Sequence, residues 1–176
     1  MSDTIKRIAI IGPESSGKSE LCRQLASHYS TNWVPEYARD YLSEIGRPYT
    51  LEDIVQIYKT QFEREQELNS GSAKYLFIDT EFLIAKVWCE HVFKACPPYL
   101  EEMIEKYPYD LYLLTAPDLP WEYDPLRENP GKGVFFFDWY KKLLIEKQLN
   151  FAVVSGQGNL RTQCAIEIIK KELEAK

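Results

Sequence analysis

Short apolar runs recur along the chain, and glycine, proline or polar residues separate them. Most of the runs are rich in β-branched or aromatic residues, which is typical of strands buried in a sheet. The first run ends directly at Gly12-Pro13. The pattern predicts five strands: Ile5–Ile11, Asn32–Val34, Tyr75–Ile78, Leu111–Thr115 and Phe151–Val154.

Between these runs, apolar residues recur every three or four positions, which predicts amphipathic helices. The clearest stripe runs from Ile54 to Phe62. Thr50 precedes it as a helix N-cap with Asp53 three residues later, and Gly71 ends it. The predicted helices are Ser19–Tyr29, Glu36–Glu44, Thr50–Leu68, Glu81–Phe93, Pro98–Lys106, Phe135–Lys147 and Leu160–Ala175.

Strands that alternate with helices predict an α/β fold, here a five-stranded parallel sheet with helices on both faces. We expect one domain over residues 1–176. Residues 117–132 lack periodicity, and a loop of this length is typical of a lid. Ligands of such sheets bind beyond the carboxyl ends of the strands, so polar residues that follow the strands are the candidates for a site.

Composition and charge narrow the function classes. The chain of 176 residues carries a net charge of −6, which argues against a nucleic-acid partner because such proteins present a basic face. No stretch reaches the roughly 20 apolar residues that cross a bilayer, and the N-terminal run is too short for a secretory signal. We therefore expect a cytoplasmic protein without a membrane partner.

Cysteine and histidine usage agrees with this expectation. The four cysteines form no CxxC pair, so reduced and mostly buried thiols are predicted. The two histidines show no spacing typical of metal ligands. These residues are Cys22, Cys89, Cys96, Cys164, His28 and His91.

The segment after the first strand, GPESSGKS, matches the phosphate-binding pattern GxxxxGK[ST] and opens a predicted helix. Its glycines permit close approach of the main chain to a phosphate, and the helix directs its positive end at the anion. Lys18 can reach the β- and γ-phosphates of ATP, and Ser19 can bind Mg²⁺. The predicted nucleotide-binding residues here are Gly12, Pro13, Glu14, Ser15, Ser16, Gly17, Lys18, Ser19 and Glu20.

Glu14 is electrostatically unfavourable inside a phosphate-binding loop, so we expect its side chain to point toward a cation or a substrate hydroxyl. Asp79 ends the third strand, where it can bind Mg²⁺ or accept a proton. The alternative is that Asp79 or Thr80 caps the next helix. Glu36 and Arg39 follow the second strand and are candidates for a base and a phosphate ligand, or for an ordinary charged helix start.

The predicted lid holds further candidates. Arg127 and Lys132 can neutralise phosphate charge, and Asp118 and Asp124 can bind hydroxyls. After the last strand, Gly156 and Gln157 are candidates for adenine binding, with a turn capped by Asn159 as the alternative. Candidates for stacking on a substrate ring are Trp33, Tyr37, Tyr41, Trp88, Trp121 and Tyr123.

A phosphate-binding loop alone does not distinguish a switch, a motor and a kinase. A GTPase switch is not predicted, because the acid at position 79 lacks the glycine of a DxxG motif and the chain has no NKxD sequence. A kinase of some nucleoside or nucleotide and a regulatory ATP-binding module both remain open.

Several stretches together resemble one family: GPESSGKS, VPEYARDYL, FIDTE followed by KVW, TAPDLPWEYDPLR and the FFFDWY helix. They are similar to the ribosylnicotinamide kinase domain of the NadR family over nearly the whole chain. The resemblance implies a P-loop fold like that of the nucleoside monophosphate kinases. It also implies transfer of phosphate from ATP, with Mg²⁺, to the 5′-hydroxyl of nicotinamide riboside.

The same resemblance gives the ring-stacking candidates a purpose. The nicotinamide ring of that substrate is a cation, which implies a cation–π contact with Trp121 or a nearby tyrosine. Lys132 departs from the family pattern, since we expect an arginine there, and arginine and lysine bind phosphate differently.

Overall fold

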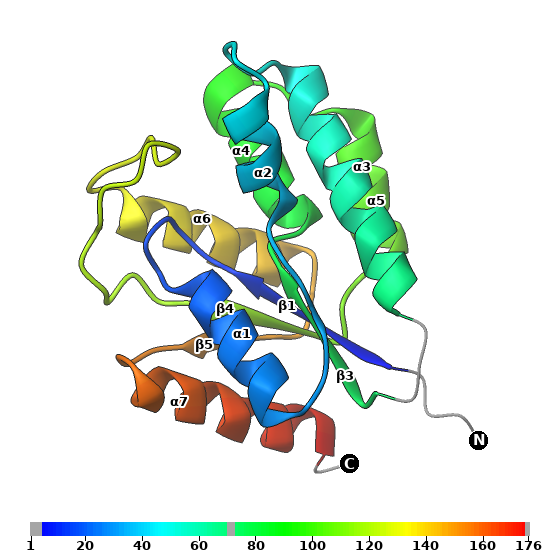
Figure 1. Ribbon diagram of the computed structural model, residues 1–176, viewed down its shortest axis with the longest axis vertical. Coiled ribbons are helices and arrows are strands. Elements are labelled where there is room, and N and C mark those ends of the chain that lie inside the picture. The colour runs from blue at the N-terminus through cyan, green and yellow to red at the C-terminus, as the bar shows by residue number, and fades with distance from the viewer. Residues whose placement is uncertain (1–4, 70–72, 175–176) are drawn as a thin grey trace.

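A computed structural model describes residues 5–69 and 73–174 and contains a five-stranded, all-parallel sheet in the order β2-β3-β1-β4-β5 (Figure 1). The strands are β1 Lys6–Ile11, β2 Trp33–Val34, β3 Tyr75–Asp79, β4 Leu111–Thr115 and β5 Phe151–Val154.

Helices connect successive strands, so each connection crosses from one end of the sheet to the other. Their bounds are α1 Lys18–His28, α2 Tyr37–Glu44, α3 Leu51–Leu68, α4 Phe82–Phe93, α5 Pro98–Lys106, α6 Gly133–Glu146 and α7 Asn159–Ile169, followed by a π-helical turn at Lys170–Glu174.

The central strand β1 pairs with β3 on one side and with β4 on the other. Its residues Ile8–Ile11 are fully buried, and both β3 and β4 are buried along their whole length. A parallel sheet covered on both faces requires such continuous apolar runs. This is why these strands are readable from the sequence as unbroken hydrophobic segments.

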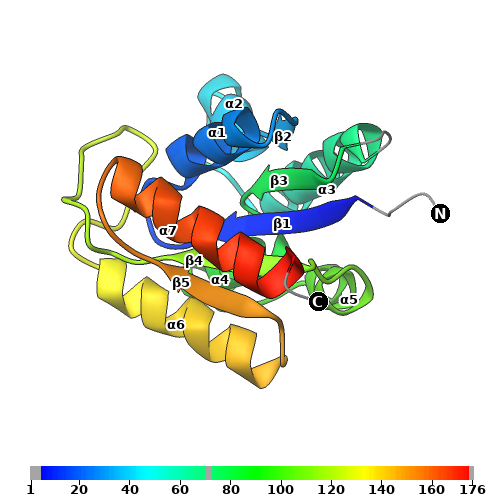
Figure 2. The same cartoon turned by 90° about the horizontal axis from the view of Figure 1, so that it is seen from below.

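Alternate strand residues pack against different helix layers. One core lies between the sheet and the pair α1 and α7, and it contains Ile8, Ile10 and Phe77. The other core lies between the sheet and helices α2 to α6, and it contains Ala9 and Ile11. Figures 1 and 2 show α7 on the opposite side of the sheet from α4 and α5.

The predicted α/β fold is confirmed, and so are the five strands to within one residue at either end. The capping box of α3 is also confirmed, because the Thr50 side chain accepts from Asp53 N–H and the Asp53 side chain from Thr50 N–H. Gly71, which was expected to end this helix, lies outside the described residues, and the helix has its C-cap at Asn69.

The alternative that Asp79 or Thr80 caps α4 is excluded, because Glu81 is the N-cap and its side chain accepts the Leu83 N–H. Helix α6 begins two residues earlier than predicted, at Gly133.

The last helix also differs from its prediction at both ends. Its N-cap is Gly158, and Asn159 is already its first residue. Beyond Ile169 the chain changes to the π-helical turn, and the predicted end at Ala175 lies outside the described residues. All four cysteines are free, and two of them, Cys22 and Cys89, are buried.

Candidate active site

The loop Gly12–Ser19 joins β1 to α1 at the carboxyl end of the sheet. Gly12 has a φ of 148°, and a Cβ atom there would lie 2.1 Å from Thr115 Oγ1. Gly17, with a φ of 75°, is the N-cap of α1 and gives that helix no side-chain cap. The first N–H groups of α1 are therefore available to an anion.

Side chains of the loop hold it against the sheet. Ser16 is 1% exposed; its hydroxyl donates to the Pro13 carbonyl at 2.7 Å and lies 2.6 Å from Thr115 Oγ1. Thr115 in turn donates to the carbonyl of Ile11 at 3.0 Å. The Lys18 ammonium donates to Pro13 O at 2.9 Å, across the space that the loop encloses. These bonds hold the loop against the end of the sheet.

Asp79 ends β3, beside this loop. It is 1% exposed, and neither of its carboxylate oxygens has a hydrogen-bond partner. Burial and the negative charge of Glu36 raise the pKa of Asp79 to about 7, against the opposing effect of Lys18. A buried carboxylate without a partner, together with the Ser19 hydroxyl, fits a Mg²⁺ ion, which prefers such oxygen ligands.

Glu36 and Arg39 lie at the start of α2 and line the same cavity. Glu36 occupies the N-cap position, yet its side chain makes no capping hydrogen bond. Arg39 donates to the carboxylate of Asp124 at 2.8 Å and so connects α2 to the 117–132 loop. The structure thus brings the two predicted acids close enough for their charges to interact.

The 117–132 loop, yellow-green in Figure 1, is joined to the phosphate-binding loop through Glu14. The Glu14 carboxylate accepts hydrogen bonds from the main-chain N–H groups of Glu128 (3.0 Å) and Asn129 (3.1 Å), and from the Asn129 side chain. Ser15 adds a hydrogen bond with the Glu122 N–H at 3.0 Å. Glu14 therefore faces main-chain donors of the loop, in place of the expected cation or substrate hydroxyl.

A cavity of about 660 Å³ lies between the phosphate-binding loop, α2, α4, α6 and the 117–132 loop. The residues predicted from the sequence that line it are Gly12, Pro13, Glu14, Ser15, Ser16, Gly17, Lys18, Ser19, Glu20, Glu36, Arg39, Trp88 and Arg127. The predicted residues that do not line it are Trp33, Tyr37, Tyr41, Asp79, Asp118, Trp121, Tyr123, Asp124, Lys132, Gly156 and Gln157.

Two groups of these residues have other partners. The Tyr41 hydroxyl donates to Asp53 at 2.7 Å, at the N-terminus of α3. Asp118 accepts from the Gly156 N–H at 2.7 Å and forms an ion pair with the buried Arg161. Asp118 thus joins the start of the 117–132 loop to the β5–α7 turn and to α7.

On the far wall of the cavity, sequence reasoning found Trp88 but missed its neighbours. There the Trp88 indole N–H donates to the Tyr49 hydroxyl at 3.1 Å, and this hydroxyl donates to the Glu128 carboxylate at 2.7 Å. Burial raises the pKa of Tyr49 to about 12, so the hydroxyl stays protonated. Arg47 and His91 also line this wall. Tyr49 was missed because it directly precedes Thr50, the N-cap of α3. A capping box indicates the start of a helix and says nothing about a ligand.

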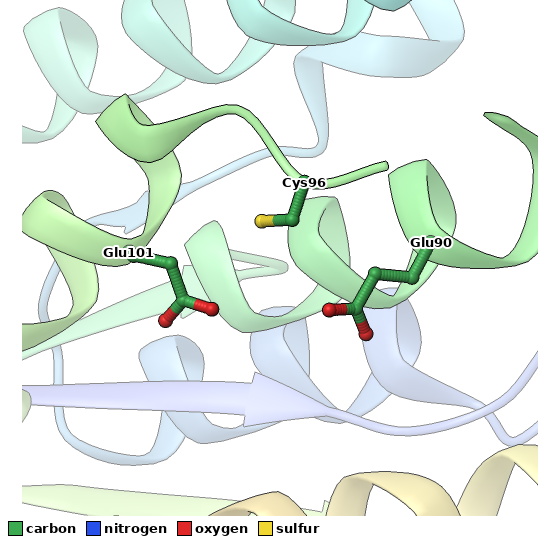
Figure 3. Close-up of side chains that lie close together, drawn as sticks. All are labelled: Glu90, Cys96 and Glu101. Atoms are coloured by element: carbon green, nitrogen blue, oxygen red, sulfur yellow. The ribbon is translucent and has the colours of Figure 1, made fainter. Parts of the chain in front are cut away.

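One further group of side chains has the spacing of metal ligands. Glu90, Cys96 and Glu101 place ligand atoms within 4.8 Å of one another, between α4 and α5 (Figure 3). However, the ammonium group of Lys86 forms hydrogen bonds with both carboxylates. A metal ion would have to displace this cation, so the group is an ion-pair network that joins the two helices.

The geometry is that of a P-loop, and comparison with known proteins assigns the family. A family model described as an AAA domain matches residues 7–161. The chain belongs to this AAA-domain family. Within the described residues of this AAA domain, no helix combines the length and apolar character needed to span a bilayer.

Two curated relatives are similar over 95% of this chain. Both are described as trifunctional NAD biosynthesis/regulator protein NadR, and they are 31% identical (Salmonella typhimurium) and 32% identical (Escherichia coli). The chain covers 42% of the length of each.

Solved structures show the same fold. A NadR protein in complex with NR matches with a TM-score of 0.81 at 21% identity, over 98% of this chain and 52% of that one. Thymidylate kinase from Ehrlichia chaffeensis matches with a TM-score of 0.65 at 11% identity, over 95% of this chain and 100% of that one. The fold is therefore that of P-loop nucleoside and nucleotide kinases, and the predicted NadR resemblance is confirmed.

Proposed function

We propose that the chain is a kinase that uses Mg²⁺-ATP to phosphorylate the 5′-hydroxyl of nicotinamide riboside, giving nicotinamide mononucleotide. The observation that carries this proposal is the single cavity, which joins a P-loop at one end to a wall of tryptophan, tyrosine and carboxylate groups at the other. Similarity to NadR proteins, one of them in complex with NR, supports the choice of substrate.

The residues in and beside the cavity have the following proposed roles. Lys18 neutralises charge on the β- and γ-phosphates, and the arginines at positions 39 and 127 stabilise charge on the transferred group. Ser19 and Asp79 would hold Mg²⁺, which supplies further neutralisation of the phosphates. Glu36 lines the cavity and is the better placed of the two acids to accept the proton of the hydroxyl.

The aromatic wall suits the nicotinamide ring. The ring is a pyridinium cation, and such cations bind over aromatic faces. Trp88 is the ring-stacking candidate that lines the cavity, with Tyr49 beside it at 5.1 Å between ring centroids. We also propose that residues 117–132 act as a lid of a single domain, because their contacts to the P-loop are side-chain hydrogen bonds that can open.

A second candidate is a kinase of another nucleoside or of a nucleotide. The fold match to thymidylate kinase, and that to a deoxyadenosine kinase from M. mycoides with a TM-score of 0.61, favours it. A third, a regulatory module that binds ATP without transferring phosphate, has the P-loop alone in its favour.

The test is release of ADP from Mg²⁺-ATP with and without nicotinamide riboside. Adenosine, uridine and deoxycytidine serve as comparison acceptors, and Lys18→Ala serves as the blank. We expect stimulation by nicotinamide riboside that the variant loses. Stimulation by another acceptor alone would replace the substrate and keep the mechanism. Bound nucleotide without stimulation by any acceptor would favour the regulatory module.

A further inference from the structure

Gln61 bridges the two chain segments that carry Glu36 and Asp79, just beyond the point where β2 stops pairing with β3. It is on the inner face of α3, 2% exposed, and does not line the cavity. Its side-chain oxygen accepts from the Tyr37 N–H at 2.8 Å, and its amide nitrogen donates to the Asp79 carbonyl at 3.0 Å. Because one partner can only donate and the other can only accept, the orientation of the amide is fixed.

The sheet explains why Asp79 needs this donor. Strand β2 pairs with β3 only as far as Val34 and Ile78. The Thr80 N–H donates to β1 at 3.2 Å, and a trans peptide directs its carbonyl the opposite way, so the Asp79 carbonyl faces β2. There β2 has already ended at Val34, and its pairing with β3 goes no further. The buried glutamine supplies the donor that the strand cannot.

The Gln61 side chain also accepts a hydrogen bond from the first N–H group of α2. Tyr37 is the first residue of this helix, and its N–H is one of the groups that lack a partner within a helix. An acid at the N-cap usually accepts from such groups, but Glu36 makes no capping bond. Since the Glu36 side chain makes no capping bond, its carboxylate is left for the cavity that it lines.

On the basis of the kinase function proposed above, we infer that Gln61 is a positioning residue. It sets the separation between Glu36 and Asp79 by bridging the main chain beside each of them. It touches neither substrate nor phosphate, and it acts only through the two acids.

The first test is Gln61→Met, which keeps the length and burial of the side chain and removes both hydrogen bonds. With Mg²⁺-ATP and nicotinamide riboside, we expect kcat to fall roughly 10- to 100-fold, while KM for ATP stays within about twofold. Ile57→Val is the matched control: it lies one turn earlier on α3, is 1% exposed, and loses only packing. It should lower the melting temperature without changing kcat. Equal losses of kcat in both variants would overturn the inference.

If Gln61→Met does not fold, Gln61→Asn replaces it. Asparagine keeps the amide but is one methylene shorter, so it can reach only one of the two main-chain partners. The same fall in kcat with an unchanged KM is expected, and a kcat equal to that of the wild type would overturn the inference.

A double-mutant cycle separates positioning from a general loss of structure. Once Glu36→Gln has removed one acid, its spacing from the other no longer matters. Adding Gln61→Met should therefore slow turnover by no more than about twofold further. Losses that multiply would mean that Gln61 acts independently of Glu36 and would overturn the inference.

A binding measurement distinguishes failure of the inference from failure of the proposed function. A wild type without acceptor-dependent release of ADP would overturn the function alone. The role of Gln61 is then tested by calorimetry. The measured quantity is the gain in ATP affinity when Mg²⁺ is added, compared between the wild type and each variant. We expect Gln61→Met to reduce this gain roughly fivefold or more, and Ile57→Val to leave it unchanged. An unchanged gain in Gln61→Met would overturn the positioning role.

Discussion

The P-loop and the 117–132 loop form opposite sides of one cavity, yet the chain holds them in different ways. The P-loop is fixed by main-chain geometry and burial, as at Gly12, which leaves no room for a Cβ, and at Ser16, which is 1% exposed. The 117–132 loop is held by hydrogen bonds and ion pairs near the surface. In one of them, the side chains of Arg39 and Asp124 are 50% and 22% exposed.

This difference separates two tasks. Groups that stabilise transferred charge work best when they are already in place, so a rigid P-loop favours catalysis. Contacts near the surface are worth about 1 kcal/mol or less each, so we expect the other loop to open and close at little cost if it acts as the proposed lid. Substitutions in the P-loop should therefore abolish function or folding, and those in the 117–132 loop should modulate it.

The largest difference in kcat/KM is expected between variants of two cationic residues that line the cavity, Lys18 and Arg127. Lys18→Ala should lower kcat/KM about 1,000-fold or more, because a preorganised charge on the phosphates is lost. Arg127→Ala should lower it roughly tenfold, since this side chain lies on the movable side and is held by the Glu122 carbonyl. Steady-state release of ADP measures both, and the exposed Lys142→Ala controls for loss of charge. Equal effects of the two variants would contradict the division between the loops.

The two aspartates should respond to pH with opposite sign. The pKa of Asp79 is about 7 in the folded chain and 3.8 in the unfolded chain. At a pH between these values, the folded chain therefore holds a proton that the unfolded chain has released. Its contribution to stability is present below pH 4 and is lost as the pH rises through 7, a loss of a few kcal/mol at about 1.4 kcal/mol per unit. Asp79→Asn should be more stable than the wild type at pH 8, and this advantage should vanish toward pH 4.

Asp124, in the 117–132 loop, is the matched case. The Leu126 N–H and Arg39 lower its pKa, so its stabilising contribution is present above pH 4 and is lost as the pH falls. Asp124→Asn should thus be slightly less stable than the wild type at pH 7, with no difference near pH 3. Urea unfolding of both variants without nucleotide or metal measures this, and parallel pH profiles would contradict it.

Glycines in the two loops offer a third comparison. Gly12→Ala should lower the free energy of unfolding by about 3 kcal/mol, because its Cβ would overlap Thr115. Gly131→Ala, at a φ of 76° with no atom within 4 Å of the added Cβ, should cost only about 1 kcal/mol of conformational strain. Denaturant unfolding tests both variants. If Gly12→Ala were as stable as Gly131→Ala, the P-loop would be able to shift and accommodate the added Cβ atom.

The smallest effect concerns the ion pair that connects α2 to the 117–132 loop. A double-mutant cycle on Arg39 and Asp124 should give a coupling below about 1 kcal/mol in unfolding, because both side chains reach solvent. A coupling above about 2 kcal/mol would mean that this loop is held as rigidly as the P-loop.

The rigid side of the cavity was largely predictable from the sequence. GPESSGKS specifies its own main-chain path, and the acid after an apolar strand falls beside it because parallel strands end at one edge. Glu36 and Arg39 followed from the same rule. These predictions depend only on local sequence and sheet topology.

The movable side was not predictable residue by residue. Asp118 and Trp121 have suitable chemistry, but an aperiodic loop does not indicate which side chains face the cavity. Tyr49 and Gln61 were missed for a different reason. Each lies next to, or inside, a helix whose sequence reads as purely structural, and only contacts over long sequence distances reveal their partners.

The strand order also has a consequence during synthesis on the ribosome. Strand β1 lies at the centre of the sheet, so neither neighbour exists when it leaves the exit tunnel. Its first partner is complete only at Asp79 and its second at Thr115. At about 5 to 20 residues per second, β1 waits roughly 3 to 14 seconds for its first partner. During this interval the nascent chain offers Ile8–Ile11 to chaperones, and the nucleotide-binding loop that follows β1 cannot yet take its final shape.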